Sequence, residues 1–283
     1  MMKFMKKAAA AVMAAAMMAA LAGCGGTSAS SAAASSKATS SSTSAAAGAA
    51  VEKIKTSGTL KVGVKADIPK YSLLNTTTNQ YEGFEDDLAK VIAGKIFDGD
   101  TSKVEFTTVN AKTRGPLLDK GDIDMVIATF TITDDRKQQY DFSDPYMTDA
   151  VGFLVKKDSG IKSLKDMNGK TIGVAQSATS RSALEDQAKQ EGITLKFSEF
   201  ATYPEIKAAL DSGRIDVFSV DKSILNGYID DKTEILDDTY APQDYGVATK
   251  KGNDDLAKLV NDTVTDLKSS GELQKMLDKW EIK

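Results

Sequence analysis

The sequence contains no histidine and only one cysteine among its 283 residues. Without histidine the chain cannot build a Ser-His-Asp or Cys-His nucleophile pair, a histidine metal site or an imidazole acid/base. One cysteine forms no internal disulfide bond and no cysteine-rich zinc site. The formal charge of −4 argues against nucleic acid as the main partner. Because the sequence also lacks a Gly-rich phosphate loop, we expect no cofactor.

The N-terminal residues have the pattern of a secretory signal. Three lysines within the first seven residues precede an apolar run over 8–21, which is short for a membrane span. The run ends in Leu21-Ala22-Gly23-Cys24, which resembles the lipobox of bacterial lipoproteins. An ordinary signal with an incidental Cys24 is the alternative. We therefore predict a signal peptide over 1–23 and a lipid on Cys24 that anchors the protein outside the cytoplasm on the cell membrane.

Residues 25–50 contain only Gly, Ala, Ser and Thr apart from Lys37. Such a segment cannot bury enough apolar surface to offset the entropy lost on ordering. We predict that residues 24–50 are a lipidated cysteine and a flexible tether with a reach of roughly 25–30 Å.

The rest of the chain alternates between strand and helix patterns. Strands are predicted over 60–64, 104–109, 124–128, 152–155, 171–175, 195–200 and 216–220, and helices over 83–97, 110–118, 180–191, 204–211, 222–229 and 254–268. This alternation predicts an α/β fold with mostly parallel sheets.

An internal repeat divides this region. Residues 118–126 recur as 210–218, and both copies combine a helix end, a glycine stop and a buried strand. Each helix follows a candidate cap, Asn110 or Thr202, and Thr202 with Glu205 forms a capping box. Any helix-glycine-strand unit can look similar, but we favour two related lobes.

The repeat also predicts a site. Ligands of open α/β sheets bind beyond the carboxyl ends of the strands, where Thr129 and Asp221 lie at equivalent positions. If the lobes face each other, these two residues face each other across a cleft. The alternatives are a helix N-cap for Asp221 and a turn hydroxyl for Thr129.

Arg136 places a cation in the first turn of a helix, where the helix dipole disfavours it. An arginine beside helix N–H groups makes a good carboxylate clamp, because guanidinium offers a bidentate fork. Arg114 lies early in the helix after Asn110 and is a similar candidate. The alternative is a solvated surface arginine.

Four ordered motifs carry a family resemblance. Gly83–Leu88, Thr131–Arg136, Phe142–Tyr146 and Ser219–Asp221 together resemble the polar amino-acid family of extracellular solute-binding proteins, which feed ABC importers. The resemblance covers essentially all of 51–283. Asp86 departs from it, since the family usually has an apolar residue there. Segments 65–69, 110–118 and 240–246 look closest to aspartate/glutamate binders.

The resemblance implies a two-lobed periplasmic-binding-protein-like clamp of type II. Each lobe would be a mixed, mostly parallel sheet flanked by helices, with two hinge strands between the lobes. Lobe 1 would comprise 55–152 plus 246–283, and lobe 2 would comprise 153–245. Hinge closure around the ligand is the motion expected of this class, and we expect a monomer.

The resemblance also implies roles at the cleft. Arg136 would bind the ligand α-carboxylate, assisted near Thr131 and by Thr179 and Ser180. Asp221 would accept from the α-ammonium group, with Thr129 as a helper. Arg114 would hold a side-chain carboxylate. Further candidates are Lys65, Tyr203, Tyr245 and Tyr71.

Charge counting points to an acidic ligand, because buried ions must be paired. Aspartate or glutamate carries two negative charges and one positive charge, and Arg136 with Arg114 against Asp221 gives the reverse. Lys65 adds a positive charge that the sequence does not balance. We therefore predict a binding protein, not an enzyme, that delivers L-aspartate or L-glutamate to an ABC permease and ATPase. Glutamine or another polar amino acid, a dehydratase-like enzyme and a surface adhesin or sensor are the alternatives.

Overall fold

The computed structural model describes residues 48–282. The predicted signal peptide, Cys24 and most of the predicted tether lie outside these residues. Within the described range, no helix combines the length and the apolar character needed to cross a membrane.

The first sheet has the strand order β5-β1-β6-β14-β7. Strand β1 (Leu60–Val64) lies parallel to β5 (Val104–Thr108) and β6 (Met125–Ile127). Strand β14 (Ala248–Lys250) comes from the end of the chain and pairs antiparallel with both β6 and β7 (Tyr140–Phe142). A small antiparallel sheet adjoins β1 in sequence and consists of β2 (Asp67–Ile68), β3 (Ser72–Asn75) and β4 (Gln80–Glu82).

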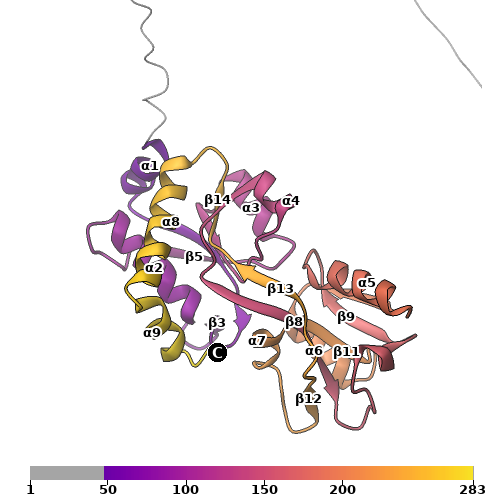
Figure 1. Ribbon diagram of the computed structural model, residues 1–283. Coiled ribbons are helices and arrows are strands. Elements are labelled where there is room, and N and C mark those ends of the chain that lie inside the picture. Colours follow the sequence, from indigo (N-terminus) through magenta and orange to yellow (C-terminus); the bar gives the residue numbers. More distant parts are fainter. Residues whose placement is uncertain (1–47, 283) are drawn as a thin grey trace, which may run out of the picture. The chain divides into compact units, whose positions relative to one another are not determined.

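Helices from both ends of the described chain pack together beside this sheet. Helices α1 (Ala49–Ser57) and α2 (Phe84–Ile96) contact α8 (Asp254–Ser269), and α2 also contacts α9 (Glu272–Lys279) (Figure 1). Helix α2 buries Leu88, Ile92 and Ile96, which lie on one helical face. Helix α1 begins at Ala49, so the last two residues of the predicted tether, 49 and 50, are helical and not part of a flexible segment. Helices α3 (Arg114–Lys120) and α4 (Asp134–Gln139) complete this part.

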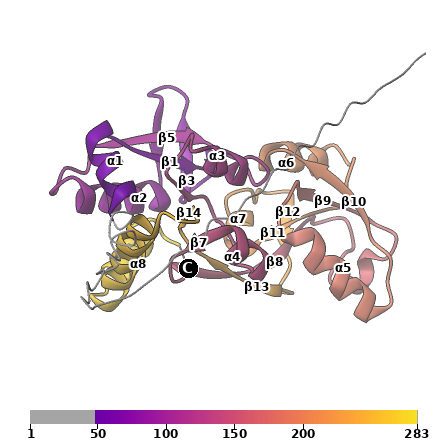
Figure 2. The same cartoon turned by 90° about the horizontal axis from the view of Figure 1, so that it is seen from above.

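The second sheet has the order β10-β9-β11-β8-β12. Strands β10 (Lys196–Phe200), β9 (Thr171–Ala175) and β11 (Val217–Asp221) are parallel, while β8 (Met147–Lys156) runs antiparallel to β11. Strands β12 (Thr233–Ile235) and β13 (Tyr240–Tyr245) both pair with β8. The helices here are α5 (Ser180–Glu191), α6 (Tyr203–Asp211), the short α7 (Lys222–Leu225) and a 3₁₀ helix over Leu164–Met167. Figure 2 shows α5 beside β9 and β10.

The predicted α/β class and all seven predicted strands are confirmed, and the capping box of Thr202 and Glu205 is present. The prediction that a helix starts from Asn110 is wrong. The Asn110 side chain instead accepts from the N–H groups of Lys112 and Thr113 in an Asx turn, and α3 begins at Arg114. The helix predicted over 222–229 ends at Leu225, because the chain turns at 226–228.

Candidate functional site

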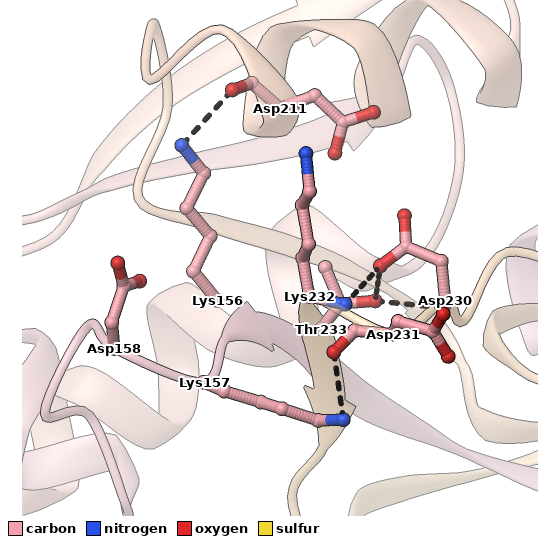
Figure 3. Close-up of a pocket in the computed structure, with 8 residues that line it drawn as sticks. All are labelled: Lys156, Lys157, Asp158, Asp211, Asp230, Asp231, Lys232 and Thr233. Atoms are coloured by element: carbon pink, nitrogen blue, oxygen red, sulfur yellow. Dashed lines mark hydrogen bonds between the residues drawn. The ribbon is translucent and has the colours of Figure 1, made fainter.

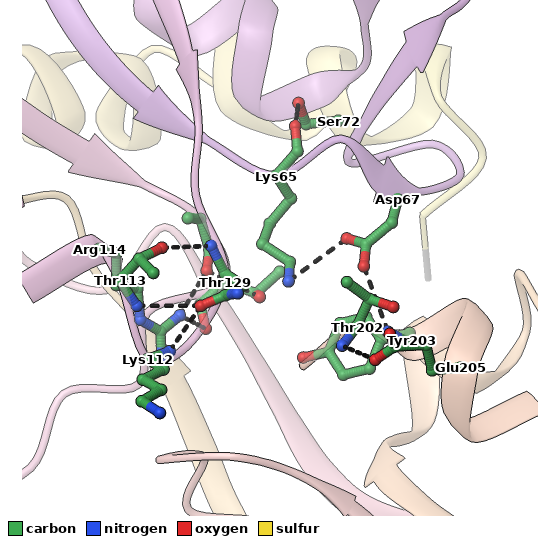
Figure 4. A network of polar contacts seen from close by, with 12 residues as sticks. Lys65, Asp67, Ser72, Lys112, Thr113, Arg114, Thr129, Thr202, Tyr203 and Glu205 are labelled. Carbon is green, nitrogen blue, oxygen red and sulfur yellow. Dashed lines mark hydrogen bonds and ion pairs between the residues drawn. The ribbon is translucent and has the colours of Figure 1, made fainter. Parts of the chain in front are cut away.

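Lys65 lies directly after β1 and is buried. Its Nζ lies 3.3 Å from Oδ1 of Asp67 and 4.4 Å from the centre of the Tyr203 ring (Figure 4). The other oxygen of Asp67 accepts from the backbone N–H of Tyr203 at 3.3 Å. Burial lowers the pKa of Lys65, and the Asp67 carboxylate opposes that effect. The structure therefore supplies the counter-ion that the sequence did not assign to Lys65.

Arg114, the first residue of α3, is buried, and its guanidinium contacts the Phe130 ring. One terminal nitrogen donates to the carbonyl oxygens of Ala128 at 2.6 Å and Thr129 at 3.2 Å, and the Phe130 ring lies 4.0 Å away. Its Nε has no hydrogen-bond partner within the described part of the chain. Arg114 thus uses one nitrogen to fix the loop after β6 and keeps a buried donor for another acceptor.

Arg136 lies over the same Phe130 ring, at 4.7 Å. Its guanidinium donates to the carbonyl oxygen of Thr131 at 2.7 Å and to that of Ser177 at 3.3 Å. Thr133 caps the helix by accepting from the Arg136 backbone N–H. Burial lowers the pKa of Arg136 to about 9, and the nearby Arg114 charge acts in the same direction. Two guanidinium groups therefore lie against the Phe130 ring, at 4.0 Å and 4.7 Å from its centre, and such cations are suited to bind a carboxylate.

Glu85 at the start of α2 is completely buried. Its Oε1 accepts from the backbone N–H of Thr129 at 2.6 Å and from the Tyr146 hydroxyl, while Oε2 has no partner among the described residues. Burial raises the pKa of Glu85, and these two donors, Arg114 and Lys65 oppose the rise. Thr129 has a left-handed backbone with φ of 45°, and its hydroxyl donates to Ala128 O. Glu85 therefore holds the Thr129 turn and lowers the net positive charge around Arg114.

Asp221 ends β11 and is buried. Its Oδ2 accepts from the Tyr245 hydroxyl of β13, and the Tyr245 ring lies 6.3 Å edge-on from that of Tyr71. The residue occupies the N-cap position of α7, but its side chain makes no cap bond. Burial raises the pKa of Asp221 to about 7, while the bond from Tyr245 lowers it. The Asp221 carboxylate is therefore held by the Tyr245 hydroxyl and not by an N-cap hydrogen bond.

Gln243 on β13 connects two other predicted residues. Its Oε1 accepts from the hydroxyls of Thr131 at 2.9 Å and Thr179 at 2.6 Å, and its Nε2 donates to Ala241 O. Ser180, the first residue of α5, is buried beside Thr179.

The structure brings most predicted residues into two linked groups. Lys65 and Tyr203 meet through Asp67, while Arg114, Thr129, Thr131 and Arg136 surround Phe130. No hydrogen bond joins Thr129 to Asp221 among residues 48–282, although their strands end at equivalent positions.

The sequence offered Glu85 and Asp67 only as acids in the cleft for the dehydratase-like alternative, and it gave no indication of Gln243. The spacing of Lys65 and Asp67 carries a usable signal, because residues two apart in an extended segment share a face. A polar stretch such as Pro242-Gln243-Asp244 carries no such signal.

A separate pocket of about 720 Å³ is lined by Lys156, Lys157, Asp158, Asp211, Asp230, Asp231, Lys232 and Thr233 (Figure 3). Its lysines donate within the pocket, Lys156 to Asp211 O and Lys157 to Asp231 O. No cluster of three or more possible metal ligands occurs in the described range. Because the lysines of this pocket are bonded within it, we place the candidate site at the residues around Phe130, which are Arg114, Thr129, Thr131 and Arg136.

The chain is similar to known proteins in both sequence and structure. The model of the bacterial extracellular solute-binding proteins, family 3, matches residues 60–283. The chain is 36% identical over 230 residues to the ABC transporter glutamine-binding protein GlnH of Bacillus subtilis strain 168, covering 80% of this chain and 82% of that one. It is 39% identical over 216 residues to a glutamine-binding protein of Geobacillus stearothermophilus, covering 75% and 80%.

Solved structures match as well. An ancestral arginine-binding protein bound to arginine aligns with a TM-score of 0.70 at 37% identity, covering 79% of this chain and 98% of that one. The predicted two-lobed α/β fold is thereby confirmed, and so is the resemblance to polar amino-acid-binding proteins. The chain belongs to family 3 of the bacterial extracellular solute-binding proteins and is an amino-acid-binding protein of the ABC-importer type.

Proposed function

We propose that this protein captures L-glutamine and delivers it to an ABC importer. The observation that carries the proposal is the balance of charge at the candidate site. With each group in its charged form, three cations, Lys65, Arg114 and Arg136, are matched by three carboxylates, Asp67, Glu85 and Asp221. Asp149 also acts on Asp221, but it is outside this count because its carboxylate accepts from Ser223. A site with no formal net charge matches a zwitterion whose side chain is neutral.

This balance changes the charge count made from the sequence. That count set two arginines against Asp221 and left Lys65 unmatched. The 3.3 Å ion pair to Asp67 now matches Lys65, and buried Glu85 acts on Arg114. A glutamate ligand would therefore bring one uncompensated negative charge. The two glutamine-binding relatives support the same ligand.

In this proposal the α-carboxylate binds to Arg136 with the help of Arg114, since both guanidinium groups lie against the Phe130 ring. The α-ammonium group binds the Asp221 carboxylate. The Tyr245 hydroxyl fixes that carboxylate by donating to its Oδ2. The side-chain amide lies toward the Lys65–Asp67 pair, which offers both a donor and an acceptor to an amide. Closure of the two lobes would remove these groups from water and strengthen each contact.

An acidic ligand is the second candidate, and one observation favours it. The buried Nε of Arg114 has no partner among the described residues, and a side-chain carboxylate would satisfy it. Calorimetric titration of the purified protein with L-Gln, L-Glu, L-Asp, L-Asn, L-cystine and L-Arg separates the two. We expect L-Gln to bind most tightly. Tighter binding of L-Glu or L-Asp would replace the glutamine proposal with the acidic one, and no binding of any amino acid would overturn both.

The signal peptide, the lipid on Cys24 and the lobe boundaries at 152/153 and 245/246 stay proposals. Metabolic labelling with a radioactive fatty acid, compared between the natural chain and Cys24→Ala, tests the lipid. Label on the natural chain alone supports it, and no label on either chain contradicts it.

A further inference from the structure

The hydroxyl of Ser72 lies between two oxygen atoms. Ser72 is fully buried in β3, and its Oγ is 2.6 Å from the backbone oxygen of Lys65 and 2.8 Å from Oδ1 of Asp86. Figure 4 shows the first of these contacts. A serine hydroxyl has one proton and donates one hydrogen bond, whereas a backbone carbonyl oxygen can only accept.

This proton count fixes the direction of both contacts. The single proton of Ser72 must point to Lys65 O, because that oxygen has no proton of its own. The contact with Asp86 then needs a proton from Asp86. If Asp86 were ionised, Ser72 would donate to the carboxylate, and two unprotonated oxygens would face each other at 2.6 Å on the Lys65 side.

The surroundings of Asp86 also favour a neutral carboxyl group. The side chain has no exposed surface, and its Oδ2 has no partner in the described part of the chain. Burial raises the pKa of Asp86 to about 8, against the opposing effect of Ser72. On the same helix, Glu85 and Asp87 raise it further and Lys90 lowers it.

The lysines on neighbouring elements form ion pairs with carboxylates other than Asp86. Lys65, after β1, pairs with Asp67 of β2 at 3.3 Å, and Lys279 of α9 pairs with Asp87 at 2.6 Å. Neither forms an ion pair with Asp86. An ionised Asp86 would therefore be a buried carboxylate without a cationic partner, which is strongly unfavourable.

The backbone holds Asp86 and Ser72 together. The N–H groups of Phe84 and Glu85 donate to the carbonyl oxygens of Lys70 at 2.8 Å and Tyr71 at 2.9 Å. A Cβ at Gly83 would lie 2.0 Å from the Tyr71 oxygen, so only glycine permits this approach. Because the start of α2 is fixed against the residues that precede Ser72, the two side chains cannot separate when Asp86 loses its proton.

We propose that Asp86 is a proton-donating positioning residue: its neutral carboxyl group donates to Ser72, and Ser72 donates to the Lys65 carbonyl oxygen. The chain Asp86–Ser72–Lys65 fixes the turn that carries the Lys65 ammonium group into the site. The effect of this hydrogen-bonded chain on ligand binding rests on the proposed function, since Lys65 belongs to the proposed charge cluster. The protonation of Asp86 is independent of the proposed function.

Infrared difference spectroscopy without ligand tests the protonation. Protein labelled with ¹³C-aspartate is compared with the Asp86→Asn variant, whose amide also donates to Ser72. We expect the natural chain to show a protonated-carboxyl band at pH 6 that the variant lacks and that fades as the pH rises through about 8. No such band at pH 6 would overturn the proposal. If Asp86→Asn does not fold, Asp86→Leu serves the same subtraction.

Calorimetry with L-glutamine tests the positioning role. Asp86→Asn should bind within about threefold of the natural chain at pH 7, because its amide keeps the donor. Between pH 7 and 9 the natural chain should lose about fivefold to tenfold more affinity than Asp86→Asn. Lys65 is present in both proteins, so its own titration cancels. Identical pH profiles, with the infrared band present, would overturn the positioning role. Absence of glutamine binding at any pH would overturn the proposed function and leave the infrared result to decide the protonation.

Discussion

Asp149 on β8 and Gln243 on β13 are register partners in the antiparallel pair of these two strands. Gln243 accepts from Thr131 after β6 and from Thr179 at α5. Asp149 accepts from Ser223 of α7, and Ser223 in turn accepts from the Tyr71 hydroxyl at 2.8 Å. Each strand thus carries one side chain that joins residues near the first sheet to residues near the second. This pair is where we expect the closed form to be held together.

Replacing Gln243 with leucine tests this expectation. The change removes the acceptor of two hydroxyl donors, each worth about 0.5–1.5 kcal/mol. We expect about a tenfold weaker affinity for L-glutamine, expressed as faster dissociation in stopped-flow fluorescence. The matched control is Gln274→Leu on the exposed face of α9. Equal dissociation rates for the two variants would contradict the role.

Arg136 should be needed for every amino-acid ligand. Removing one partner of a buried, hydrogen-bonded charge pair costs about 2–5 kcal/mol, so Arg136→Ala should weaken binding at least thirtyfold for glutamine and glutamate alike. Lys137→Ala, at the next and exposed position, is the control and should change little. Calorimetry measures both. A loss confined to one ligand would show that Arg136 binds a side chain instead of the α-carboxylate.

Asp221 should make binding dependent on pH. Burial raises its pKa to about 7 in the protein without ligand, and an ammonium group binds the ionised form. Ligand and proton therefore compete below pH 7, so affinity should rise with pH toward 7 and level off above it, by up to about tenfold per unit. Asp221→Asn should bind weakly with no such rise, whereas the exposed Asp262→Asn should keep it. Calorimetry from pH 5 to 8 would contradict the assignment if the profile of the natural chain is flat.

The Lys65–Asp67 pair should control the choice between amide and carboxylate. Asp67→Asn removes one negative charge, so the Kd ratio of glutamine to glutamate should shift about tenfold in favour of glutamate, or about 1.4 kcal/mol. Glu281→Gln also removes a lysine-paired carboxylate, but an exposed one at 3.1 Å from Lys70, and should not shift the ratio. An unchanged ratio in Asp67→Asn would contradict the charge-balance argument.

The parts of the fold that the sequence predicts are those with strong local signals. Strand β9 and helix α5 have the predicted bounds, 171–175 and 180–191; the strand is an apolar run and Gly192 ends the helix. Strand β14 has only three residues, Ala-Thr-Lys, and β13 contains Pro242, so neither carries a periodic pattern. Both strands form through pairing with distant segments, which a local pattern does not reveal.

The same limit applies to the site. Arg136 and Asp221 stand out because each breaks or ends a local element. Glu85 looks like an ordinary acidic residue in the first turn of α2, where the helix dipole favours it. Only the packing of α2 against the β6 loop turns it into a buried acceptor for Thr129. The charge balance therefore could not be obtained before the fold was known.

Strand β14 determines which of the two sheets can be completed first as the chain is made. The second sheet uses a continuous stretch, from β8 through β13, so it can form once that stretch is available. The first sheet cannot, because β14 lies between β6 and β7 and α8 and α9 cover α2. A chain that ends before β14 would leave the β6 edge unpaired, β7 without its partner strand and the apolar face of α2 uncovered. During synthesis, the first sheet is therefore complete only after β14 has been made, whereas the second sheet does not depend on the last residues of the chain.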